Sequence, residues 1–381
     1  MPNVLIVQRI IPEYRVIFFD HLYELCKSEG IDLYVAYGQE EFGCIPKSVN
    51  YERPWSKRFD NKYFQLGSNR LVWQPCILDL WKADLVICEQ ANRLSTTYLM
   101  PILRLFGKES ALWGHGRNLQ AKPVNLNMKE IWKRKLLKFS DYFFAYTESA
   151  KTYLLDIGYD ADKIKNVENS IDVRSLVARY TAQKFANGNN IQTNSSVSNT
   201  VIYCGGLYSD KKIDFLLAAA ATIRHSIDNF KLIVIGSGPD EHLVKEFALA
   251  NSWVQFLGAK PSIECMQYFI EAKFMLMPAA VGLAVLDSFA LETPIITTDI
   301  ANHGPEFSYI EHGVNGVITS YDVDIYASKV IELLTDSVCL NGLIEGARQS
   351  SAKYSVENMA TNFMDGIKQV LRKKNDPERL L

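Results

Sequence analysis

The segment that decides the fold runs Pro278-Ala-Ala-Val-Gly282-Leu-Ala-Val-Leu-Asp287-Ser-Phe-Ala-Leu-Glu292-Thr-Pro294. It follows a short apolar run, 274–278, that has the length and composition of a buried strand. Gly282 opens a helix-like stretch, and Asp287 lies about one and a half turns into it. A strand that passes through a glycine turn into a helix is a unit of a parallel α/β sheet, and ligands bind at the carboxyl ends of such strands.

The same rhythm extends over the C-terminal half of the chain. Short apolar runs rich in β-branched residues alternate with longer segments of helical period, which is typical of a parallel sheet buried on both faces. We predict a doubly wound domain with strands at 201–205, 232–236, 254–258, 274–278 and 295–298, and with helices near 212–226 and 240–250.

The N-terminal half repeats this architecture. Its predicted strands are 4–8, 33–37, 85–89, 111–114 and 142–147, and its predicted helices lie near 15–28, 95–106, 128–139 and 148–157. A chain of 381 residues suits two cores better than one. We therefore predict an N-terminal domain at 1–170 and a C-terminal domain at 171–355, with the helical segment 356–381 packing back on the first. The polar stretch 187–199 has almost nothing to bury and is predicted to be a loop.

Composition excludes several classes of protein. A net charge of −2 argues against a general nucleic-acid binder, which would carry a basic excess. The seven cysteines are scattered and never spaced as C-x-x-C, so neither a disulfide framework nor a zinc site is indicated. The chain shows no signal peptide and no run of about 18 apolar residues. We predict a cytoplasmic protein that meets a membrane, if at all, from its inner face.

Glycine turns at the predicted strand ends are candidates for phosphate binding. Gly205 and Gly206 follow one strand, and Lys211 stands where the next helix begins. Small residues let backbone amides approach a phosphate, and a lysine adds a full positive charge; the alternative is a tight turn with a solvated lysine. Gly236-Ser-Gly238-Pro239 lacks the third glycine and the ribose-binding acid of a dinucleotide fingerprint, so a tight turn and a ligand contact both stay open.

The order of these motifs resembles the donor domain of glycosyltransferase family 4. The resemblance extends over about 115 residues, continues to Asn169-Ser-Ile-Asp172, and is looser in the N-terminal half, at Pro12-Glu-Tyr-Arg15 and Trp113-Gly-His115-Gly116. The motifs that carry it are Gly205-Gly206-Leu207, Lys211, Gly236-x-Gly238-Pro239, Phe256-Leu-Gly258, Gly282-Leu283, Asp287, Glu292-Thr-Pro294, Gly304-Pro-Glu306 and Gly313-Val-Asn-Gly316.

The resemblance implies a GT-B fold, in which two Rossmann-like α/β domains face each other across a cleft. It implies a retaining transfer of a sugar from a nucleotide-diphosphate sugar to a glycan or lipid-linked acceptor, of the kind used in bacterial surface polysaccharide synthesis. The donor would bind in the C-terminal domain and the acceptor in the N-terminal one. The residues it suggests are His115 and Lys211 for catalysis; Gly205, Gly206, Lys211, Gly236, Gly238, Gly258, Val281, Gly282, Leu283, Asp287 and Glu306 for the donor; and Arg15, Glu89 and Arg117 on the acceptor side.

Several positions depart from the family pattern. Gly206 stands where the family has an arginine that holds the diphosphate. Ala279 and Asp287 stand where it has a Glu-x7-Glu pair, so the acid that usually touches the sugar is absent. Glu292 replaces a usual glycine and is expected to be an exposed acid at a helix end.

No metal and no other cofactor is predicted, because the leaving phosphates could be stabilised by Lys211 and backbone amides alone. The segment 129–139 has five basic residues and apolar residues at helical spacing. It is either a helix that lies on anionic lipid or a surface helix packed on its own domain. Two further alternatives are a non-catalytic GT-B subunit and a GT-B sugar-nucleotide epimerase.

Overall fold

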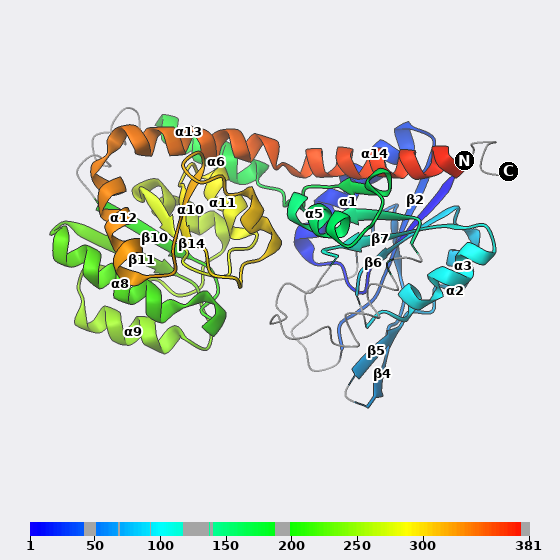
Figure 1. The fold of residues 1–381 in the computed structure, drawn as a ribbon, viewed down its shortest axis with the longest axis horizontal. Coiled ribbons are helices and arrows are strands. Elements are labelled where there is room, and N and C mark those ends of the chain that lie inside the picture. The colour runs from blue at the N-terminus through cyan, green and yellow to red at the C-terminus, as the bar shows by residue number, and fades with distance from the viewer. Residues whose placement is uncertain are drawn as a thin grey trace. The chain divides into compact units, whose positions relative to one another are not determined.

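The computed structural model describes residues 1–41, 51–67, 69–91, 93–116, 137, 140–186 and 199–374. The chain divides into two compact units (Figure 1). Unit 1 is Met1–Asp172 together with Val356–Leu381, and unit 2 is Val173–Ser355. The predicted loop 187–199 lies outside the described residues except for Asn199, and the predicted helix 128–139 lies outside them except for Leu137.

Unit 1 is built on a parallel sheet in the order β3-β2-β1-β6-β7-β8-β9. Alternate residues of β1 enter two different cores: Val4 and Ile6 join one cluster, and Leu5 and Val7 join the other. The sheet is therefore buried on both faces, as the apolar runs predict. Its strands are β1 (Asn3–Val7), β2 (Asp32–Tyr37), β3 (Ser56–Arg58), β6 (Leu85–Glu89), β7 (Glu109–Gly114), β8 (Tyr142–Ala145) and β9 (Ile164–Asn166).

Helices cover both faces of this sheet, and a separate antiparallel hairpin, β4 (Lys62–Leu66) with β5 (Asn69–Trp73), extends from it. The helices of unit 1 among the described residues are η1 (Glu13–Arg15), α1 (Val16–Ser28), α2 (Ile77–Lys82), η2 (Ser95–Leu99), α3 (Met100–Leu105), α5 (Glu148–Asp156), η3 (Ala161–Lys163) and α14 (Val356–Lys374).

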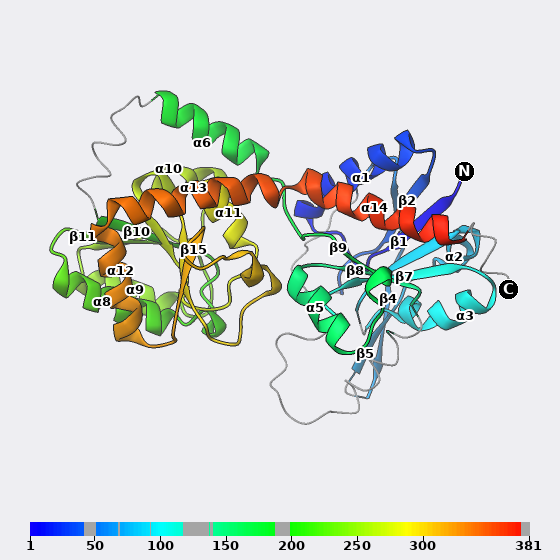
Figure 2. The same ribbon diagram turned by 45° about the horizontal axis from the view of Figure 1, so that its top comes forward.

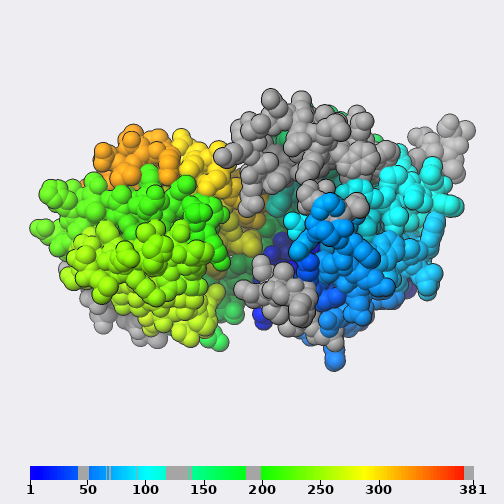
Figure 3. All heavy atoms as spheres, turned by 90° about the horizontal axis from the view of Figure 1, so that it is seen from below, coloured from blue at the N-terminus to red at the C-terminus, as the bar shows by residue number. Residues whose placement is uncertain are grey.

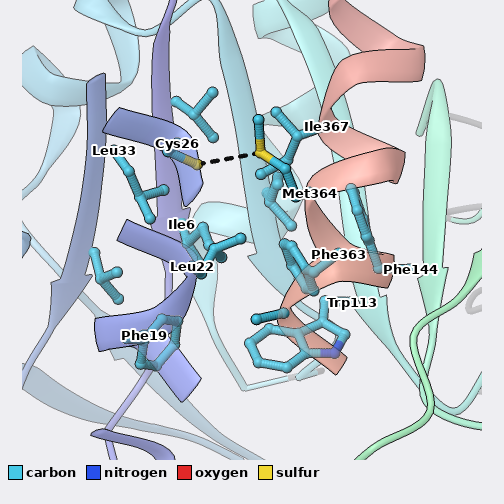
Figure 4. Close-up of a cluster of buried hydrophobic side chains, with 14 of the residues drawn as sticks. Ile6, Phe19, Leu22, Cys26, Leu33, Trp113, Phe144, Phe363, Met364 and Ile367 are labelled. Carbon is cyan, nitrogen blue, oxygen red and sulfur yellow. Dashed lines mark hydrogen bonds between the residues drawn. The ribbon is translucent and has the colours of Figure 1, made fainter. Parts of the chain in front are cut away.

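The helix α14 returns to unit 1 and lies along α1, as both ribbon views show (Figures 1 and 2). Its apolar residues recur at helical spacing, and the ring of Phe363 stacks on Phe144 with centroids 4.3 Å apart. The same ring packs against Trp113 (Figure 4), with centroids 5.0 Å apart, and the ring of Phe18 lies 5.5 Å from it by the same measure. Residues more than 340 positions apart in the sequence thus share one core.

Unit 2 has a parallel sheet in the order β12-β11-β10-β13-β14-β15. The strands are β10 (Asn199–Cys204), β11 (Phe230–Ile235), β12 (Val254–Phe256), β13 (Phe274–Leu276), β14 (Ile295–Thr298) and β15 (Gly316–Thr319). The described helices are α6 (Arg174–Ala186), η4 (Ser209–Lys211), α8 (Ile213–Ser226), α9 (Glu241–Ala250), α10 (Ser262–Glu271), α11 (Ala284–Ala290), η5 (Pro305–Tyr309), α12 (Val323–Thr335) and α13 (Ser337–Lys353).

The connections of unit 2 fix the faces that its helices cover. The chain runs outward from β10 to β12, returns to β13 on the other side of β10, and continues outward to β15. Because such crossovers are right-handed, α8 and α9 cover one face, and α10 and α11 cover the other. The helices α8 and α9, green to lime, form the near surface of unit 2 in the space-filling view (Figure 3).

The predicted strands 85–89 and 295–298 have the bounds of β6 and β14. The strands β3, β4, β5, β9 and β15 were not predicted; β3 has mostly exposed residues, and β9 and β15 have only three and four residues. No helix in the described part of the chain is both long enough and apolar enough to span a bilayer.

Candidate functional site

Each unit has one point where the order of its strands reverses. In unit 2, β10 lies between β11 and β13, and in unit 1, β1 lies between β2 and β6. The two chain segments that leave such neighbouring strands go to opposite faces of the sheet, which opens a crevice at their carboxyl ends. The topology therefore singles out the loops after β10 and β13 in unit 2, and those after β1 and β6 in unit 1.

The loop after β10 carries Gly205, Gly206 and Lys211. The Tyr203 hydroxyl donates a 2.7 Å hydrogen bond to the carbonyl of Gly206. A Cβ atom at Gly206 would lie 2.4 Å from the ring of Tyr208, an exposed side chain that would have to move to admit a larger residue. Lys212 caps α8 in a left-handed conformation, with φ of 56° and no side-chain hydrogen bond to the first turn. The free N–H groups at the start of α8 thus follow Lys211 directly.

Gly236, Gly238 and Gly258 hold this loop from the β11 side. A Cβ atom at Gly236 would lie 1.9 Å from the carbonyl oxygen of Gly205, and one at Gly238 would lie 2.2 Å from that of Leu207. The N–H of Gly236 donates to the carbonyl of Gly258 at 2.9 Å. Gly236 and Gly238 are therefore needed for the close approach of two backbone segments.

The loop after β13 comes to the same crevice. The Lys211 ammonium donates a 2.5 Å hydrogen bond to the carbonyl of Ala280, a residue with φ of 47°. Gly282 faces open space, since a Cβ atom there would have no neighbour within 4 Å. Leu283 forms the N-cap of α11. The structure thus brings Lys211 together with the segment that contains Val281, Gly282 and Leu283.

Two acids flank this crevice. Asp287 lies within α11, and burial raises the pKa of its carboxyl from 3.8 to about 6. The Cys204 and Cys265 thiols lie close enough to Asp287 for its charge to act to raise their pKa values. Glu306 is buried at the start of η5, where its carboxylate would lie 3.2 Å from a Cβ atom added to Gly304.

At the switch point of unit 1, Glu89 ends β6 and accepts a 2.9 Å hydrogen bond from the backbone N–H of Arg9. Burial raises the pKa of Glu89, while the Arg9 N–H and the charges of Arg9 and Arg15 lower it. A buried carboxyl with a raised pKa at the carboxyl end of a strand is a candidate functional group.

His115 follows β7, and its ring packs edge-on against Tyr146 with centroids 4.2 Å apart. Burial lowers its pKa to about 4, and the nearby Arg15 acts in the same direction. Its Nδ1 atom is buried and has no hydrogen-bond partner among the described residues. His115 is therefore neutral at pH 7 and retains one nitrogen for a ligand.

The structure shows which residues Arg15 contacts within unit 1, and its predicted contact with an acceptor stays a prediction. The guanidinium is buried, donates to the Asn169 side chain and, at 3.4 Å, to the carbonyl of Ser170, and lies 5.4 Å from the Trp113 ring. These bonds join η1 to the segment that leads out of unit 1. Arg117 lies outside the described residues. So does the segment 129–139, except for Leu137.

The Glu292 carboxylate is paired with Lys184 of α6 at 2.6 Å. Its side chain is 18% exposed, so the expectation of an exposed acid at a helix end is wrong. The residue also has φ of 51°, a conformation that explains why glycine suits this position.

Sequence reasoning did not assign two residues that shape these loops. Gln90 accepts from the N–H of Gly116 at 2.8 Å and donates to its carbonyl at 3.2 Å, which fixes the turn after His115. His303 binds the backbone of Val281. The sequence feature that could have indicated a role for Gln90 is its position directly after a predicted strand. For His303, that feature is its position next to Gly304.

No three His, Cys, Asp or Glu side chains gather as a metal site within the described ranges. The six cysteines found there are free. The expectation that no metal is needed stays a prediction.

Comparison with known proteins identifies the domain that holds the β10/β13 crevice. Residues 198–336 match the profile described as glycosyl transferases group 1. These residues form a glycosyl transferases group 1 domain. All the donor residues predicted from the sequence lie within it.

Other similarities extend beyond this glycosyltransferase domain. D-inositol 3-phosphate glycosyltransferase of Corynebacterium urealyticum is 25% identical over 260 residues, which are 62% of this chain and 58% of that protein. The chain thus spans 58% of the length of this curated relative.

Solved structures give the fold. Anabaena HepE in complex with UDP superposes with a TM-score of 0.65 at 14% identity, covering 97% of this chain and 100% of that one. Sucrose-phosphate synthase of Thermosynechococcus elongatus gives a TM-score of 0.68 at 15% identity, covering 98% and 100%. The predicted GT-B fold, with two parallel-sheet domains, is confirmed.

Proposed function

We propose that this protein is a retaining glycosyltransferase that moves a sugar from a nucleotide-diphosphate sugar to a glycan or lipid-linked acceptor, in bacterial surface polysaccharide synthesis. The observation that carries the proposal is the bridge from Lys211 to Ala280 across the switch point of the glycosyltransferase domain. It places an ammonium group between the loop that carries Gly205 and Gly206 and the loop of Gly282, which faces open space.

This arrangement suits the chemistry of sugar transfer. The sugar becomes oxocarbenium-like while a nucleoside diphosphate departs, so negative charge develops on the phosphate oxygens. An ammonium has three N–H donors, and the bond to Ala280 leaves two of them for these oxygens. The N–H groups at the start of α8 add further donors. In this mechanism Lys211 and backbone amides stabilise the leaving group without a metal.

The remaining residues have roles that follow from their protonation states. We assign Asp287 to the ribose hydroxyls of the donor, as the resemblance implies, and neutral His115 to a hydrogen bond with the donor sugar. Glu89, at the switch point of unit 1, is assigned to the acceptor hydroxyls. UDP is the first candidate for the nucleotide, because Anabaena HepE was crystallised with UDP and with UDP-glucose.

Nucleoside diphosphates test this proposal directly. Of UDP, GDP, ADP and dTDP at a concentration about 100 times the dissociation constant, one is expected to stabilise unit 2 by about 2.7 kcal/mol and to raise its melting temperature by about 5 °C or more. Sugar transfer, measured with and without candidate acceptors, separates the transferase from an epimerase. Failure of all four nucleotides to bind would contradict the proposal and favour a non-catalytic subunit.

We also propose that the segment 129–139 contacts anionic lipid at the inner face of the membrane. Its support is the basic and amphipathic sequence alone. Vesicle flotation should weaken when Lys133, Arg134 and Lys135 are neutralised together, and unchanged flotation would remove the idea.

A further inference from the structure

The loop after β13 is held from behind by one imidazole ring. His303 lies in the loop after β14, and its Nδ1 is 3.1 Å from the backbone nitrogen of Val281. Its Nε2 is 2.8 Å from the carbonyl oxygen of Thr298. Because an N–H donates and a carbonyl accepts, Nδ1 must be unprotonated and Nε2 must carry the hydrogen. These two bonds require a neutral ring in a single tautomer.

Surrounding contacts allow the ring little freedom. It stacks on Phe307, with centroids 4.2 Å apart and planes 11° from parallel. The N–H of Gly304 donates to the carbonyl of Val281 at 2.7 Å. Both backbone groups of Val281 are thus bonded to the segment that contains His303.

This attachment determines the position of the neighbouring carbonyl. Ala280 precedes Val281 and has φ of 47°, a left-handed conformation that costs about 1–2 kcal/mol for a residue other than glycine. Such a conformation persists where surrounding contacts impose it. The peptide group that joins the two residues places the Ala280 carbonyl against the Lys211 ammonium and the Val281 N–H against His303. The orientation of one peptide plane therefore connects the imidazole to the lysine.

Two charged groups act on His303. Lys211 ends η4, and Asp299 follows β14. Burial lowers the pKa of His303 and Lys211 acts in the same direction, while the hydrogen bond to Thr298 and the charge of Asp299 raise it. The ring is neutral at pH 7 and takes up a proton only in more acidic solution.

We propose that His303 is a positioning residue of the donor site: its neutral ring holds the 280–281 peptide in the orientation that places Lys211, and protonation of Nδ1 releases that peptide. A proton on Nδ1 would oppose the Val281 N–H with a second N–H, so that bond is lost. This inference rests on the proposed function, since the loop matters through the diphosphate that binds beside it.

Three variants separate the contributions of the ring. His303→Asn keeps an acceptor oxygen near the place of Nδ1, His303→Gln provides a donor that reaches toward Thr298, and His303→Phe keeps only the stacking on Phe307. We expect His303→Phe and His303→Gln to raise the KM for the nucleotide sugar about 10- to 100-fold, and His303→Asn to raise it less than about fivefold. In the wild type, kcat/KM should fall on the acid side as both His303 and Asp287 are protonated, and in His303→Asn only the part of this fall that Asp287 causes should remain.

A measurement without substrate makes the test independent of turnover. In the ¹⁵N-labelled full chain, the amide resonance of Val281 should titrate together with the His303 ring, and should not titrate in His303→Asn. Nucleotide turnover with equal KM values for His303→Phe and the wild type would overturn the inference while the proposed function stands. A Val281 amide that ignores pH would overturn it as well. If the Val281 amide titrates but the protein binds no nucleoside diphosphate, the result would support the role of His303 in holding the 280–281 peptide and would contradict the proposed function.

Discussion

Replacing Lys211 by alanine is expected to lower kcat about 100- to 1,000-fold while the protein stays folded. The side chain supplies the positive charge at the crevice between β10 and β13, and removing one such group from a site that stabilises developing negative charge costs about 3–4 kcal/mol of transition-state stabilisation. Steady-state kinetics with the nucleotide sugar that supports turnover measures the loss.

Two controls make this result specific. Lys245→Ala removes a lysine on the exposed side of α9, which is paired with Glu241 at 2.8 Å, and should leave kcat unchanged. Lys211→Arg keeps the charge but changes its geometry, so it should recover part of the activity. Full activity in Lys211→Ala would remove the leaving-group role on which the mechanism depends.

The variant Asp287→Asn is expected to be more stable than the wild type at pH 8, by about 2 kcal/mol, and to bind the nucleotide less well. The folded carboxyl has a pKa of about 6 and the unfolded one 3.8. Between these pH values the folded state binds more protons than the unfolded state, so the stability of the wild type rises as the pH falls from 6 to 3.8. Above pH 6 the carboxylate is ionised in both states, and the full cost of burying its charge is present. A shift of about 2 pKa units corresponds to about 3 kcal/mol, from which the burial of the asparagine amide subtracts about 1.

Chemical denaturation at pH 8 and pH 4 measures this effect. At pH 4 the folded wild-type carboxyl is protonated, so the stability advantage of Asp287→Asn should be lost and the two proteins should differ by no more than about 1 kcal/mol. The exposed Glu246→Gln in α9 should match the wild type at both values. Titration calorimetry should show nucleotide binding weakened about 10- to 100-fold in Asp287→Asn, the usual effect of losing a hydrogen bond to a charged group. Equal stability at pH 8 would show that the carboxyl is not penalised by burial.

Local sequence signals predicted the sheet edge of unit 2 well. Glycine after an apolar run marks a turn wherever it occurs, so Gly205, Gly206 and Gly282 were found without any knowledge of tertiary contacts. The role of Gly236 was not predictable, because the atom that excludes a side chain there is the carbonyl oxygen of Gly205, 31 positions earlier.

Charged residues were predicted less well, because their partners are distant in the sequence. Arg15 was predicted to contact a ligand, and the sequence did not indicate that its guanidinium is bonded to Asn169 and Ser170. Glu292 looked exposed until its partner Lys184 was known. A single sequence shows which residues are charged but not which partner each of them has in the fold. That partner decides whether the charged group stabilises the fold or is left to bind a ligand.

The proposed mechanism depends most on the place where the diphosphate binds. Hydrogen–deuterium exchange of the full chain, with and without the nucleoside diphosphate that stabilises it most, measures this place directly. We predict slower exchange of the backbone amides in 205–215 and 280–285, with little change in β15 and α13. Nucleotide binding that protects other segments and leaves both loops unchanged would contradict the account.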